Sequence, residues 1–127
     1  MTYSELISNN NIDISQNELD FQSAFDQGNW EKMWWCVYYA CQNIAKSIYK
    51  KRNVIVEEED LYDVVIDGTT YCMKFIKKGV RPEKLSSYCF LRVRRFIDNP
   101  KKVWEEQNIV QFPVDSNGKE IEYGRSE

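Results

Sequence analysis

The sequence predicts an all-α fold, a small helical bundle followed by a short C-terminal tail. Two long stretches, about 30–51 and 57–77, repeat apolar residues three and four positions apart, which is the period of a helix packed on one side. Residues that end or cap helices stand between the stretches: Gly28, Asn29 and Gly79. At 127 residues, 43% of them hydrophobic, the chain is long enough for one domain with a modest core.

The N-terminal third contains two predicted helices. Residues 1–14 are polar and rich in Asn, and we expect them to be mobile. Ser15 can cap a short helix that ends near Gly28, and Asn29 can cap a long helix over 30–51. The apolar stripe of the long helix consists of Trp30, Met33, Trp34, Val37, Cys41, Ile44, Ala45 and Ile48. Further aromatic residues lie off this stripe, so the helix is either buried on a second side or offers them to a partner: Trp35, Tyr38, Tyr39 and Tyr49.

Two more helices follow. The acidic start of 57–77 suits the positive end of a helix dipole, and Gly79 ends this helix. Gly68 lies on its apolar face, where Gly costs roughly 1 kcal/mol relative to Ala. We therefore expect the 30–51 helix to cross close to Gly68. The fourth helix is predicted to begin near Glu83 or Ser86 and to end at Ile97.

These helices form one predicted domain over 15–105, and 106–127 form a tail. The tail is predicted to be either a small hairpin around Asn117-Gly118 or an extended segment.

The residue types argue against catalysis. The chain has no histidine, so no Ser-His or Cys-His pair can form, and it has no glycine-rich phosphate loop. Its cysteines form no Cys-x-x-Cys motif, and Cys36 and Cys41 point about 140° apart on one helix. We therefore expect no enzyme, no metal site and no cofactor, and buried reduced thiols at Cys36, Cys41, Cys72 and Cys89.

Charge is distributed unevenly along the chain. The net charge of −3 argues against strong non-specific binding to nucleic acid. Acidic residues gather in 56–67 and basic residues in 74–102, so one face can meet a basic protein and another can meet phosphate. No apolar run approaches the ~20 residues that span a bilayer, and the N-terminus lacks a signal pattern. We expect a cytoplasmic protein without membrane contact.

Five short segments follow one another in an informative order. They are Glu59-Asp60-Leu61, Gly68, Met73-Lys74-Phe75, Leu85-Ser86-Ser87-Tyr88-Cys89 and Arg92-Val93-Arg94-Arg95-Phe96-Ile97. This order and spacing resemble region 2 of bacterial RNA polymerase sigma factors. The resemblance implies an all-α bundle that binds RNA polymerase, directs it to promoters and opens DNA at a −10-type element.

The resemblance also implies two sets of site residues. The helix matching 57–77 docks on the coiled coil of the largest polymerase subunit, which predicts polymerase contacts at Glu59, Asp60, Asp63 and Asp67. The usual Gln-Glu after the leucine is replaced, one residue further on, by Asp63-Val64. The helix matching 86–97 faces promoter DNA, which predicts DNA contacts at Tyr88, Leu91, Arg92, Arg94 and Arg95.

Within the DNA set, Tyr88 matches a base-stacking tyrosine, whereas Leu91 and Arg92 stand where the family has two tryptophans. Spacing alone allows a second interpretation, in which Tyr88 belongs to the core and the arginines form a solvated face.

Other functions stay open. A sigma-like fold without promoter opening would act as a polymerase-binding modulator or as a helical structural or interaction protein of a phage, and an unrelated helical adaptor is a third reading. The Lys-, Asn- and Ile-rich composition suggests a bacteriophage, and so the cytoplasm of a phage-infected or bacterial cell. The segment Gln107–Phe112 weakly resembles a peptide that binds the bacterial sliding clamp, with Val110 in place of Leu.

Overall fold

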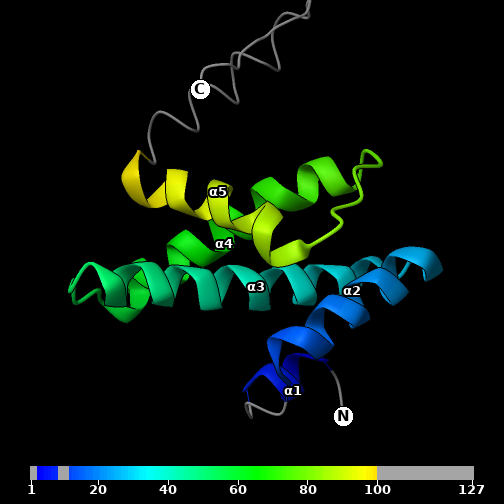
Figure 1. Cartoon of the computed structure of the whole chain (residues 1–127), viewed down its shortest axis with the longest axis horizontal. Helices are drawn as coiled ribbons and strands as arrows, with labels where there is room; N and C mark the ends of the chain where they lie inside the picture. Colours follow the sequence, from blue (N-terminus) through cyan, green and yellow to red (C-terminus); the bar gives the residue numbers. More distant parts are fainter. Residues whose placement is uncertain (1–2, 9–11, 100–127) are drawn as a thin grey trace, which may run out of the picture. The chain divides into compact units, whose positions relative to one another are not determined.

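The computed structural model describes residues 3–8 and 12–99, and these residues are predominantly helical (Figure 1). The helices are α1 (Tyr3–Ser8), α2 (Ile14–Gln27), α3 (Trp30–Lys51), α4 (Glu58–Ile76) and α5 (Leu85–Asp98). No strand occurs within the described ranges, so the predicted all-α fold is confirmed there. The predicted tail and the clamp-like segment Gln107–Phe112 lie outside the described residues.

The chain divides into two compact units, residues 1–94 and 95–127. The first unit holds α1 to α4 and α5 as far as Arg94. Of the second unit, the structure describes residues 95–99, where Phe96 is buried. Within the described part of the chain, no helix has both the length and the apolar character needed to cross a membrane.

The N-terminal segment contains a helix that the sequence analysis did not expect. In α1, Ile7 is buried, and the Tyr3 hydroxyl donates a hydrogen bond to Oδ1 of the buried Asn17 at 2.7 Å. The polar, Asn-rich composition of this segment hid these anchors. The expected cap at Ser15 is also wrong, because α2 begins at Ile14 and Asp13 accepts from the Gln16 amide at 2.7 Å.

The boundary between α2 and α3 follows from local chemistry, as predicted. Gly28 adopts a left-handed conformation (φ 67°) that ends α2, and its amide donates to the carbonyls of Ala24 and Phe25. The side chain of Asn29 then accepts from the Lys32 amide at 3.1 Å and caps α3. Helix α3 is central, because α1, α2 and α4 all pack against it (Figure 1).

Three helices meet at Gly68. This glycine is buried in α4, and a Cβ built on it would lie 3.5 Å from the Cys41 sulfur on α3. The same Cβ would lie 3.1 Å from Cγ2 of Val93 on α5. The close crossing of α3 and α4 is therefore confirmed, and α5 approaches Gly68 as well.

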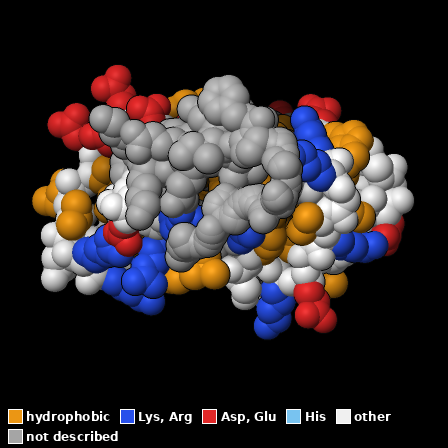
Figure 2. All heavy atoms as spheres, turned by 90° about the horizontal axis from the view of Figure 1, so that it is seen from above, with side chains coloured by type: hydrophobic (Ala, Val, Ile, Leu, Met, Phe, Trp, Pro, Cys, Tyr) orange, Lys and Arg blue, Asp and Glu red, His pale blue; other side chains and the backbone are white. Residues whose placement is uncertain are grey.

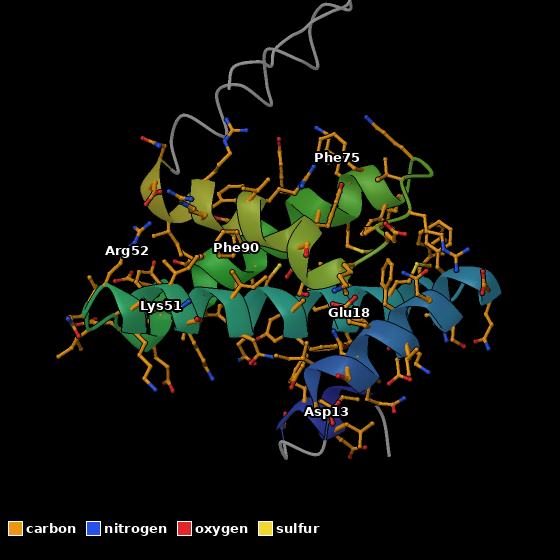
Figure 3. The ribbon with its side chains drawn as sticks, in the orientation of Figure 1. Asp13, Glu18, Lys51, Arg52, Phe75 and Phe90 are labelled. Carbon is orange, nitrogen blue, oxygen red and sulfur yellow. The ribbon has the colours of Figure 1, made fainter. Side chains whose placement is uncertain are left out.

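Helix α2 supplies the N-terminal cap of α5 from a distance in the sequence. Glu18 lies beside the start of α5, where its Oε1 accepts from the Leu85 amide at 2.7 Å and its Oε2 from the Ser86 amide at 2.8 Å (Figure 3). A carboxylate at this position satisfies two amides that lack helical partners and opposes the positive end of the helix dipole. Glu18 therefore fixes where α5 starts relative to α2.

The loop before α5 is held by the same helix. Arg81 forms an ion pair with Asp26 at 2.8 Å, donates to Oε1 of Gln22 at 2.7 Å and lies over the Phe25 ring at 4.8 Å from its centroid. Because these contacts are exposed, they orient the loop more than they stabilise the fold.

Replacing the Glu18 cap should destabilise the protein. We expect Glu18→Ala to lower the free energy of unfolding by about 1–2 kcal/mol, because two helix-terminal amides lose their acceptor. Urea unfolding followed by circular dichroism measures this change. Glu83→Ala is the matched control, since Glu83 is exposed near the same helix start, and it should change stability by less than about 0.5 kcal/mol. Equal losses in both variants would contradict the capping role of Glu18.

Candidate functional site

The four predicted polymerase contacts lie on α4. Glu59 and Asp60 are exposed in its first turn, and Asp63 is exposed one turn later. Asp67 is half-buried and already takes part in a polar interaction. Spacing of four residues places Glu59, Asp63 and Asp67 on one side of the helix. Glu59, Asp60 and Asp63 are therefore exposed on the first half of α4, whereas Asp67 is less accessible.

A groove of about 570 Å³ runs between α3 and the first half of α4. Its lining consists of Tyr38, Gln42, Lys46, Glu58, Glu59, Leu61, Tyr62, Asp63 and Val65. Glu59 and Asp63 therefore face a defined hollow, whereas Asp60 and Asp67 do not line it. Acidic groups beside aromatic and aliphatic side chains suit a partner segment that carries both basic and apolar residues, such as an amphipathic helix.

Aromatic side chains extend from this groove along α3. The rings of Trp34 and Tyr38 stack with centroids 5.5 Å apart, and Trp35 meets both of them edge-on. All three are half-buried, so they are neither a closed core nor a free surface. Burial, with a smaller effect of nearby Tyr62, raises the pKa of the Tyr38 hydroxyl, which stays neutral. Tyr38 thus joins the aromatic cluster to the groove.

Sequence reasoning missed Tyr62 as a groove residue. Its side chain is 56% exposed on α4, which is unusual for a large aromatic residue beside a hollow. Its position off the apolar stripe of α4 was the available signal, but the hollow itself depends on how α3 and α4 pack.

The predicted DNA contacts lie on α5. Tyr88 is half-buried, and the Arg92 guanidinium lies over its ring, 3.7 Å from the centroid. Arg92 also donates to the Tyr88 carbonyl at 2.8 Å. Burial raises the pKa of Tyr88 to about 12, although the charge of Arg92 acts in the opposite direction. Tyr88 and Arg92 therefore form a cation–π pair, in which the guanidinium covers one face of the neutral ring.

The remaining predicted DNA contacts differ in exposure. Leu91 is 60% exposed, an unusual position for an aliphatic side chain, and Arg94 is exposed as well. Arg95, the first residue of the second unit, is half-buried. Figure 2 shows the molecule from above relative to Figure 1. On this face, several groups of Lys and Arg side chains lie among hydrophobic ones. Exposed apolar and basic groups on one helix are compatible with a nucleic-acid interface.

A second hollow, of about 300 Å³, lies between α2, α3 and α5. Its lining includes Ile14 from α2, Lys51 from α3 and Phe90 from α5, and Phe90 is 40% exposed. Figure 3 shows Phe90 on α5 and Lys51 on α3. The sequence analysis did not single out Phe90, because one aromatic residue in a helix carries no signal of its own.

Comparison with protein-family models, with curated proteins and with solved structures finds no match to this chain. A functional proposal therefore depends on the sequence resemblance and on the chemistry of α4 and α5.

Proposed function

We propose that this protein binds bacterial RNA polymerase through α4 and helps to direct it to promoters through α5, as sigma factor region 2 does. The observation that carries the proposal is the separation of the two residue sets implied by the resemblance. Three of the four acidic residues are exposed on α4, where Glu59 and Asp63 line a groove, and the aromatic and basic set lies on α5. One protein can thus hold polymerase with one helix while another helix meets DNA.

The α4 groove suits the coiled coil that the resemblance implies as partner. Exposed carboxylates at Glu59 and Asp63 would attract a basic helix and speed its association. The exposed ring of Tyr62 and the half-buried ring of Tyr38 offer apolar area at the same place. Such aromatic residues carry much of the binding energy in protein interfaces.

The α5 residues suit DNA that polymerase has already engaged. A net charge of −3 makes strong binding of free DNA unfavourable, so the protein needs polymerase to bring promoter DNA to α5. Arg94 is exposed, although it already takes part in another interaction, and an exposed guanidinium suits phosphate contacts that position the duplex. Tyr88 offers an aromatic ring for an unpaired base.

Binding of purified core polymerase to the tagged protein tests the α4 contact. We expect Glu59→Lys combined with Asp63→Lys to weaken binding at least tenfold, because attraction becomes repulsion on the lining of the groove. The matched control combines Glu31→Lys with Glu83→Lys, which makes the same change in net charge at exposed positions away from the groove. Like Glu59, Glu31 lies in the first turn of its helix.

The two double variants separate docking from general electrostatics. Equal loss of binding in both would contradict a specific role for the groove, as would unchanged binding in the Glu59 and Asp63 variant. Circular dichroism should give the same helicity for both variants and the wild type.

A polymerase-binding modulator without promoter opening is the second candidate. It is favoured by Leu91 and Arg92, which replace the tryptophan pair of the family, and by the coverage of Tyr88 by Arg92. Promoter-dependent transcription with purified polymerase separates the two functions. Specific transcripts require the sigma-like role, whereas polymerase binding without transcripts supports the modulator.

Arg94→Ala should weaken binding of the polymerase complex to promoter DNA and make it less sensitive to salt. Loss of one phosphate contact reduces the slope of log affinity against log salt concentration by about 1. Filter binding at several salt concentrations measures this slope. Lys50→Ala, an exposed charge near the end of α3, should leave the slope unchanged. A wild-type slope in Arg94→Ala would remove Arg94 from the DNA interface.

A further inference from the structure

Three cysteines from three helices converge in the core. Cys41 lies on α3, Cys72 on α4 and Cys89 on α5, and each is fully buried. Their sulfur atoms all lie within 4.8 Å of one another. Sequence reasoning compared Cys36 with Cys41 on one helix and expected no metal site. It missed this cluster because the members are far apart in the chain.

The spacing of the sulfurs suits one shared ion. A thiolate binds a metal such as zinc at about 2.3 Å, so three thiolates around one ion lie about 4 Å apart. The cluster would reach this geometry by closing less than about 1 Å between sulfurs. The chain has no histidine, and the neighbouring Thr69 hydroxyl already donates to the Val65 carbonyl at 2.7 Å. The donor set is therefore three sulfurs, which selects soft ions.

The surroundings of the cluster supply a positive charge. Buried thiolates are strongly unfavourable without compensation, so the thiols need a cation or a metalloid in order to ionise. Arg92 stands three residues after Cys89, on the same side of α5, so its guanidinium lies on the side of the helix that faces the cluster. Its Nε is buried and has no hydrogen-bond partner among the described residues. An anionic ion–thiolate complex would offset the positive charge of this guanidinium, which contacts Tyr88 but no carboxylate within the described part of the chain.

We propose that Cys41, Cys72 and Cys89 bind a single thiophilic ion in a three-coordinate, all-sulfur site. A cation displaces the three thiol protons to solvent, and arsenite, As(OH)₃, loses its three hydroxyls as water when three As–S bonds form. A divalent cation leaves one negative charge for Arg92 to offset, and trivalent arsenic leaves none. The ion would link α3, α4 and α5, so it would tie the helix with the predicted polymerase contacts to the helix with the predicted DNA contacts.

Titration of the reduced full chain with Cd²⁺, Zn²⁺, Cu⁺ or arsenite tests the site. We expect at least one of these probes to bind at one equivalent per chain, with a thiolate charge-transfer band in the ultraviolet. Competition with a chelator or a small dithiol then ranks the four probes. Cys41→Ala, Cys72→Ala and Cys89→Ala should each weaken binding at least tenfold, since one of three ligands is lost.

Cys36→Ala is the matched control, because Cys36 is equally buried on α3 but stands outside the cluster. It should bind the ion as the wild type does. Loss of binding in Cys36→Ala to the same extent, or full binding in Cys72→Ala, would overturn the proposal.

A measurement on the wild type covers the case in which a cluster variant fails to fold. A bound ion that prefers the folded chain raises Tm in proportion to ln(1 + [ion]/Kd). In mild denaturant, the ion should also slow alkylation of the three cluster thiols more than that of Cys36, which gains only the general stabilisation of the fold. If none of the four probes raises Tm or protects these three thiols, the cysteines only fill space at the helix crossing and the proposal is wrong.

Discussion

Gly68→Leu should lower the free energy of unfolding by about 1–3 kcal/mol, because a buried side chain would enter a crossing that has no room for it. A Cβ at this position already lies 3.1 Å from Val93 Cγ2 and 3.5 Å from the Cys41 sulfur. The three further carbons of leucine must push α5 or α3 away or adopt a strained rotamer. Thermal and urea unfolding measure the loss.

Two controls make the Gly68 result interpretable. Thr70→Leu adds a comparable apolar side chain at an exposed position of α4, and it should change stability by less than about 0.5 kcal/mol. Gly68→Ala gains roughly 0.8–1 kcal/mol of helix propensity, which offsets part of the crowding against Val93, so it should lie between Gly68→Leu and the wild type. A Tm of the Gly68→Leu variant at or above that of the wild type would contradict the close crossing.

The boundary between α2 and α3 depends on neighbouring residues and could be predicted from the sequence. The pair Gly28 and Asn29 ends one helix and caps the next through atoms within four residues of each, so α3 occupies the predicted 30–51 range. Helix α1 could not be predicted in this way, because a six-residue helix has little stability of its own. Its stability comes from burial of Ile7 and from the hydrogen bond between Tyr3 and Asn17.

Two features that join distant residues, the cysteine cluster and the cap of α5, escaped the sequence analysis for a common reason. The sequence pattern places Cys41, Cys72 and Cys89 on apolar helix faces. Whether their sulfur atoms come together depends on the relative axial positions of the packed helices, which the pattern does not give. The cap of α5 by Glu18 likewise spans 67 and 68 residues, and no local signal marks it. The candidate site divides in the same way: the acidic residues of α4 could be read from the sequence, whereas the groove beside them arises from packing of α3 on α4.

Under the proposed function, Tyr88→Ala should reduce promoter opening roughly 5- to 100-fold while sparing the closed complex. Stacking of an unpaired base on an aromatic ring is worth about 1–3 kcal/mol, and alanine removes the ring. Arg92 covers one face of this ring at 3.7 Å, so a base can stack on the other face or displace the guanidinium. Permanganate reactivity of unpaired thymines in the polymerase complex measures opening, and filter binding measures the closed complex.

Tyr88→Phe separates the ring from its hydroxyl. The Tyr88 hydroxyl forms no hydrogen bond within the described part of the chain, and burial holds its pKa near 12, so it stays neutral under assay conditions. Phenylalanine keeps the surface for both the base and Arg92, and opening should stay within about twofold of the wild type, since loss of an unbonded hydroxyl changes little. Normal opening in Tyr88→Ala, with wild-type thermal stability, would show that Tyr88 does not stack on a base. Equal loss in Tyr88→Phe and Tyr88→Ala would instead assign the effect to the hydroxyl, and the stacking role would be wrong.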